Sequence, residues 1–146
     1  MPNLLIKLLI GIPGTMILYF AAILAIVSLT APESNGFWGI SAFGAGLFIA
    51  AIGSIFIALP CGVIISIIPL GKAPRALSIV AYGVSAALTV NLIVLVLSRV
   101  SEDGTSSSSI VMPLVISTIG STISNVLVLL LFKFMSQRSD STAKLP

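Results

Sequence analysis

The sequence predicts an all-α fold: an integral membrane four-helix bundle whose second helix is long and kinked near Pro60. Composition is the first observation: 58% of the 146 residues are hydrophobic, only 8% are charged and the mean hydropathy is +1.23. A water-soluble domain carries roughly 25% charged residues. The second is the presence of four apolar stretches, each long enough to cross ~30 Å of hydrocarbon. They are expected to form helices over about 13–30, 37–68, 76–97 and 110–134.

These four helices are expected to form a single transmembrane domain over 1–134, followed by a polar cytoplasmic tail over 135–146. We expect the first helix to begin at Pro13, because proline suits a first helical turn, where its missing N–H is not needed. Residues 1–10 then form either a short interfacial helix, with Lys7 reaching the headgroups, or the first turns of one longer, bent helix, which is the favoured interpretation. The apolar run over 8–29 exceeds the ~7–15 residues of a signal-peptide core, so we expect it to be retained.

The second apolar stretch, over 37–70, has no ionisable side chain except the thiol of Cys61. As one helix it would reach about 50 Å, which exceeds the thickness of the hydrocarbon, so it must tilt, bend or break. Pro60 removes a backbone donor from its interior. We therefore expect a kink near residues 56–59.

Small residues recur on this helix at spacings of three or four. Such stripes let helices approach closely in lipid, and small-xxx-small is their usual form. The pattern fits a seam with a second chain or packing within the bundle, and packing within the bundle is favoured. The candidate partner or helix-packing stripe consists of Gly39, Ala42, Gly46, Ala50 and Gly53.

The third and fourth helices carry neutral polar residues. On the third, Ser78, Tyr82, Ser85 and Thr89 form one stripe, while Asn91 lies on another side with Gly83 and Ala87. On the fourth, hydroxyl residues, a glycine and an asparagine share one arc, so both helices are expected to have a polar inner face. The predicted intramembrane polar face comprises Tyr82, Ser85, Asn91, Ser117, Thr118, Ser121 and Asn125.

The depths of these residues predict their contacts if the two helices run antiparallel. Asn91 is then level with Thr118, and Asn125 is level with Tyr82 and Ser85, so these pairs are expected to touch and the two asparagines are not. The hydrogen bonds either hold the bundle together or line a hydrophilic pocket or a partner's docking groove. Bundle packing is the favoured interpretation.

The distribution of charge predicts topology. With both termini in the cytoplasm, six cations lie inside and Arg99 alone lies outside, which is the positive-inside pattern. We expect a location in the plasma membrane, of the bacterial inner-membrane type. The inner cations would be Lys7, Lys72, Arg75, Lys133, Arg138 and Lys144.

Several classes of function are disfavoured. Histidine is absent and Cys61 is the single cysteine, so we expect no metal and no cofactor. The spans lack Asp, Glu, Lys and Arg at depth, which weighs against ion-coupled transport and small multidrug exporters. Serines without a histidine or lysine beside them give no basis for an enzyme. Because the cations flank apolar segments, no nucleic-acid partner is expected.

Binding remains as the expected activity, with membrane lipid and another membrane protein, or a second copy, as partners. In size, number of spans and lack of catalytic residues, the chain looks like the membrane immunity proteins that neutralise pore-forming or membrane-inserted toxins. The likeness covers the layout alone, and no motif carries it. The alternatives are a homo-oligomeric channel or passive transport subunit, which would conduct, and an accessory subunit of a larger membrane complex.

Overall fold

The computed structural model describes residues 4–30, 44, 46–48, 50–69, 75–101 and 108–142, and this part of the chain is almost entirely helical. The expectation of an all-helical protein is confirmed for these residues. The elements are α1 (Leu4–Thr30), the π-helix η1 (Ser54–Ala58), α3 (Leu59–Ile67), α4 (Ala76–Ser101) and α5 (Ser108–Thr142). Four helical segments are long and apolar enough to cross a membrane: Leu4–Leu29, Gly46–Ile67 (the second span), Ala76–Val100 and Pro113–Ser139.

The first helix starts before Pro13, as the favoured interpretation of residues 1–10 expected, and not at Pro13 itself. It runs unbroken from Leu4, so Pro13 lies inside it rather than in its first turn. The residues before Pro13 are therefore the first turns of one long helix and not a separate interfacial helix. An apolar environment favours this continuity, because every backbone group that leaves the helix there would lack water as a partner.

A π-helical turn interrupts the second span beside Pro60. Within it, the N–H of Leu59 bonds to the carbonyl of Ser54, five residues earlier, in place of the usual four. Pro60 lacks an N–H, and its ring would clash with the carbonyl of Phe56 in a regular α-helix, so a wider turn relieves both problems. The irregularity overlaps residues 56–59, where the kink was predicted.

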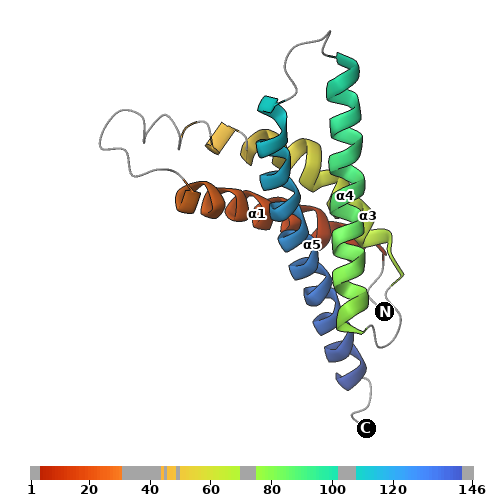
Figure 1. The fold of residues 1–146 in the computed structure, drawn as a ribbon. Helices are drawn as coiled ribbons and strands as arrows, with labels where there is room; N and C mark the ends of the chain where they lie inside the picture. The colour runs from red at the N-terminus through yellow and green to blue at the C-terminus, as the bar shows by residue number, and fades with distance from the viewer. Residues whose placement is uncertain are drawn as a thin grey trace.

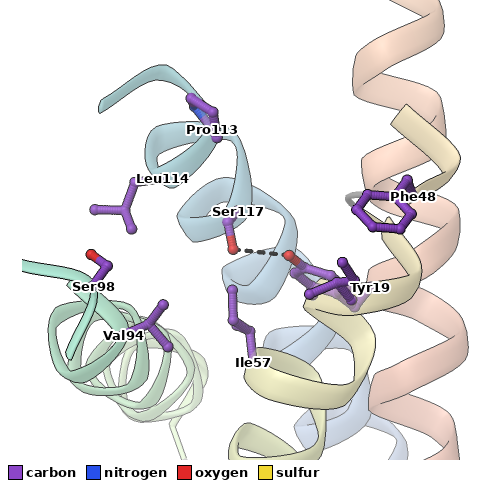
Figure 2. Close-up of a pocket in the computed structure, with 10 residues that line it drawn as sticks. Tyr19, Phe48, Ile57, Val94, Ser98, Pro113, Leu114 and Ser117 are labelled. Atoms are coloured by element: carbon purple, nitrogen blue, oxygen red, sulfur yellow. Dashed lines mark hydrogen bonds between the residues drawn. The ribbon is translucent and has the colours of Figure 1, made fainter. Parts of the chain in front are cut away.

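The helices pack as two pairs that cross. α1 contacts α3 and α5, and α4 contacts α5. In Figure 1, α1 and the second span run across α4 and α5, and Figure 2 shows α4 nearly end-on at the left and α1 upright at the right. The buried core lies at this crossing, where Tyr19, Ile23 and Cys61 form one cluster and Ile65, Val128 and Phe132 belong to a second.

The last helix extends beyond its predicted end. α5 continues to Thr142, so residues 135–142, which were assigned to a polar tail, are helical. No glycine or proline occurs between Gly120 and Pro146, and nothing in that stretch stops a helix once it has formed. The charged end of α5 therefore projects as a continuation of the apolar span.

Candidate functional site

Glycines bring α1 and α3 into backbone contact. A Cβ atom on Gly62 would lie 2.9 Å from the Cα of Ile12, and one on Gly11 would meet the hydroxyl of Ser66. That hydroxyl lies 2.6 Å from the carbonyl oxygen of Gly62 and 3.1 Å from that of Lys7, so it links the two helices. Only residues without a side chain permit this approach.

The described members of the small-residue stripe pack inside the chain. A Cβ on Gly46 would lie 2.7 Å from Cγ1 of Val27, and one on Gly53 would lie 2.8 Å from the ring of Tyr19. Ala50 is completely buried. These contacts favour packing of the second span on α1 over a seam with a second chain. The other two stripe residues, Gly39 and Ala42, lie outside the described residues.

A line of buried polar groups crosses the centre of the fold. The hydroxyls of Tyr19 and Ser117 are 2.9 Å apart and join α1 to α5. One turn further along α5, the hydroxyl of Ser121 donates to the carbonyl of Ser117 at 2.8 Å. Asn91 reaches it from α4, because its Nδ2 donates to the Ser121 hydroxyl at 3.1 Å and to the Ala87 carbonyl at 2.8 Å. The line therefore ties three helices together.

Asn125 forms the other end of this polar region. Its Nδ2 donates to the carbonyl of Gly83 at 3.2 Å, and the thiol of Cys61 lies beside its side chain. Cys61 itself points its sulfur toward the Ala86 carbonyl, 3.8 Å away. Within the described part of the chain, the Oδ1 atoms of Asn91 and Asn125 accept no hydrogen bond. Two buried acceptors thus remain unused.

The predicted contacts of the asparagines are wrong in detail. Asn91 bonds to Ser121 and not to Thr118, whose hydroxyl donates to its own helix at Leu114. Asn125 donates to the backbone carbonyl of Gly83 and not to the side chain of Tyr82 or Ser85. The cause is close approach at Gly83, where an added Cβ would lie 2.7 Å from a methyl group of Val126. The Gly83 carbonyl of α4 is therefore within reach of the Asn125 side chain of α5.

The predicted polar face of α4 is divided between two sides of that helix. Asn91 is buried, whereas Tyr82 is 44% exposed and Ser85 and Thr89 are also exposed. The expectation that Tyr82 and Ser85 line an inner face is wrong, because the glycine and alanines of the Asn91 side allow α5 to pack there instead. The α4 residues buried on that side are Ile79, Gly83, Ala86, Ala87, Val90 and Asn91.

Sequence reasoning missed Tyr19, which is fully buried and supplies the polar link from α1. A phenol in the middle of an otherwise apolar span is a signal that a hydrogen-bond partner exists, since an unpaired hydroxyl is costly in hydrocarbon. On α5, by contrast, the expected arc was correct: Ser117, Ser121 and Asn125 are buried and Thr118 is partly buried.

A cavity of about 260 Å³, here called the recess, lies beside the Tyr19–Ser117 pair. Figure 2 shows Val94 and Ser98 of α4 near Leu114 of α5, with Ile57 between them and Tyr19. The lining is almost entirely apolar. The Ser98 hydroxyl donates to the carbonyl of Leu95 at 2.8 Å, and the Tyr19 and Ser117 hydroxyls share one hydrogen bond. The recess therefore presents hydrocarbon to whatever enters it.

The described residues contain no group of three or more His, Cys, Asp or Glu side chains that would hold a metal ion.

A scan against protein-family models, a search of curated proteins and a search of solved structures found no match to this chain.

Proposed function

We propose that this chain is an integral membrane protein that acts by binding another membrane protein through the exposed side of α4. Its four long apolar helices support insertion in a bilayer. The charge pattern supports a four-helix arrangement with both termini in the cytoplasm, in a membrane of the bacterial inner-membrane type.

The observation that carries the proposal is a polar stripe on the outside of a spanning helix. Ala81, Ser85 and Thr89 recur every four residues and are all exposed, and Tyr82 lies beside them. We call these four residues the α4 stripe. Ser85 and Thr89 lie within about 5 Å of the middle of the Ala76–Val100 span, where a bilayer supplies no water.

A partner helix would bind this surface in two ways, through hydrogen bonds and through close packing. The Thr89 hydroxyl donates to the carbonyl of Ser85 at 2.8 Å, but the hydroxyls of Tyr82 and Ser85 form no hydrogen bond with any described residue. Each bond to a partner would contribute roughly 0.6 kcal/mol and seldom more than about 1.7 kcal/mol. The small side chains at spacing four would also let a second backbone approach closely.

The layout supports a role like that of the membrane immunity proteins, which bind a pore-forming or membrane-inserted toxin. In that role the partner is a transmembrane helix of the toxin with hydrogen-bonding side chains of its own. The α4 stripe would keep the toxin helix from associating with other toxin subunits and so prevent a pore from forming.

Site-specific photocrosslinking in intact cells tests the partner. A benzophenone side chain at position 85 is expected to form an adduct with one unrelated membrane protein. The matched control is the same group at Ile17, which is 68% exposed on α1 and should form no such adduct. Equal adducts at both positions, or adducts with copies of this chain alone, would contradict the proposal.

A protection assay tests the role. Cells that make the chain are challenged with pore-forming bacterial toxins, and survival is compared between the wild type and Ser85→Leu. The variant is expected to lose protection against one toxin while it accumulates normally, because Leu removes the hydroxyl and blocks close approach. Protection that is absent in the wild type against every toxin tested would refute the immunity role.

A further inference from the structure

Lys133 is a cation within the apolar part of α5. It lies seven residues, or about 10 Å, from the middle of the Pro113–Ser139 span, whereas hydrocarbon extends about 15 Å to each side of a bilayer's middle. The side chain is half-buried and forms no ion pair with any residue that the structure describes. A lysine at this depth extends its ammonium group toward the headgroups, where an anion can neutralise it.

An open groove of about 520 Å³, here called the α5 groove, lies along the same part of the helix. Its leucines lie nearer the middle of the span, and its polar residues lie nearer the end of the helix. A phospholipid has the same order, with acyl chains toward the middle of the bilayer and a polar headgroup at its surface. The groove is lined by Leu127, Leu130, Leu131, Lys133, Phe134 and Gln137.

Two other helices bring cations to this end of α5. A Cβ atom on Gly11 of α1 would lie 3.0 Å from the ring of Phe132, so Lys7, one turn before Gly11, lies near the last turns of α5. The start of α4 lies beside the same turns in Figure 1 and carries Arg75, which is exposed. Neither Lys7 nor Arg75 forms an ion pair with a described residue. The tertiary structure thus gathers cations that are far apart in the sequence.

Acidic residues do not cancel this charge. Asp140, two turns beyond Lys133 on α5, is the one acid that the sequence places near this end. Glu33, Glu102 and Asp103, which lie outside the described residues, follow the opposite ends of α1 and α4 in the sequence. Six cations therefore flank this end against one acid: Lys7, Lys72, Arg75, Lys133, Arg138 and Lys144. An anionic ligand has the complementary charge.

We propose that the α5 groove holds one anionic phospholipid, with an acyl chain along Leu127 and Leu131 and its phosphate paired with Lys133. In the proposed topology this lipid belongs to the cytoplasmic leaflet, whose surface is anionic. The cations of α1 and α4 strengthen the attraction, and each Lys or Arg near such a surface changes lipid affinity about fivefold. The inference rests on membrane insertion, which is part of the proposed function, but it is independent of the proposed protein partner.

Native mass spectrometry of the full chain in detergent tests the lipid site. The protein is titrated with phosphatidylglycerol or with phosphatidylcholine carrying the same acyl chains, and bound lipids are counted. One phosphatidylglycerol is expected to bind at least about fivefold more tightly than phosphatidylcholine. Lys133→Gln should lower the affinity for phosphatidylglycerol about fivefold and leave phosphatidylcholine binding unchanged. Lys133→Arg keeps the charge and should bind phosphatidylglycerol as the wild type does.

Two matched controls separate the α5 groove from other surfaces. Arg99→Gln removes a cation from the opposite end of α4 and should leave phosphatidylglycerol binding unchanged. Phe134→Ala removes a ring from the groove and should weaken binding of both lipids about threefold, because apolar contact with the acyl chain is lost. Phe56→Ala, on the second span, should weaken neither, although its ring is 64% exposed against 62% for Phe134.

Three results would overturn the proposal. The first is equal binding of the two lipids by the wild type. The second is an equal loss in Lys133→Gln and Arg99→Gln, which would show a general effect of charge, and the third is a loss in Lys133→Gln that Lys133→Arg does not restore. Extraction by alkaline carbonate and the crosslink at position 85 are measured on the same variants. A chain that is not inserted, or that has no protein partner, is thereby distinguished from one that lacks the lipid site.

Discussion

Gly62→Ala is expected to destabilise the protein through the contact between α1 and α3. The added Cβ would lie 2.9 Å from the Cα of Ile12 and 3.2 Å from the carbonyl oxygen of Gly11. Because carbon atoms pack at about 3.5–4.0 Å, α1 would have to move by at least about 0.6 Å. The obstacle is backbone, which cannot rotate away as a side chain can.

The expected magnitude follows from two opposing effects. Overpacking of a close contact costs about 1–3 kcal/mol. The exchange of glycine for alanine in a helix returns up to about 1 kcal/mol of helix propensity. The net expectation is a loss on the order of 1–2 kcal/mol in the free energy of unfolding.

Equilibrium unfolding in mixed micelles, followed by helical circular dichroism as sodium dodecyl sulfate increases, measures this loss. Two glycines provide matched controls. Gly44→Ala meets no atom within 4 Å, and at Gly14 the nearest contact of the new Cβ would be an ordinary 3.6 Å to a methyl group of Val128. Both variants should be as stable as the wild type or slightly more stable. If Gly62→Ala is as stable as Gly44→Ala, the close approach of α1 and α3 is refuted.

Three further predictions concern the buried polar region. A double-mutant cycle of Tyr19→Phe and Ser117→Ala in the same assay should give a coupling of about 0.6 kcal/mol and no more than about 1.7 kcal/mol, and a coupling of zero would contradict the 2.9 Å contact between their hydroxyls. Asn125→Leu should change the free energy of unfolding by less than about 1 kcal/mol, because the lost bond to Gly83 is offset by removal of an unused buried oxygen, and a loss above about 3 kcal/mol would refute this balance. A membrane-permeant maleimide should label Cys61, which is fully buried, only after unfolding, because the reactive thiolate needs water; a cysteine placed at Ser141, which is exposed and lies beyond the Pro113–Ser139 span, in a Cys61→Ser background should react in the folded protein, and rapid labelling of native Cys61 would show that the core is open.

The buried side of α5 was predictable because its sequence has a single interpretation. Hydroxyl groups, a glycine and an asparagine fall on one arc and large aliphatic residues on the other, so only one face can pack closely. Ser117, Ser121 and Asn125 are buried as that pattern requires, while Ile119 and Ile123 are exposed. The interruption at Pro60 was predictable for a similar reason, since a missing N–H is a property of the residue itself.

The buried side of α4 was not predictable, because its sequence has two competing patterns. One side carries Tyr82, Ser85 and Thr89, and the other carries Gly83, Ala87 and Asn91, so both offer polar groups with small residues. The contact between Gly83 and Val126 shows which side packs on α5. The number of polar groups, on which the prediction relied, does not measure how closely a second helix can approach.

The sequence by itself determined the helical class, the four apolar segments and the break beside Pro60, because each of these depends on local composition or on one residue's chemistry. The tertiary structure alone decided which face of α4 is covered, how the helix pairs cross and that the hydroxyl of Tyr19 meets the one of Ser117, 98 residues away in the chain. These features depend on the surfaces of two helices at once, and no periodicity within either helix contains the shape of its partner.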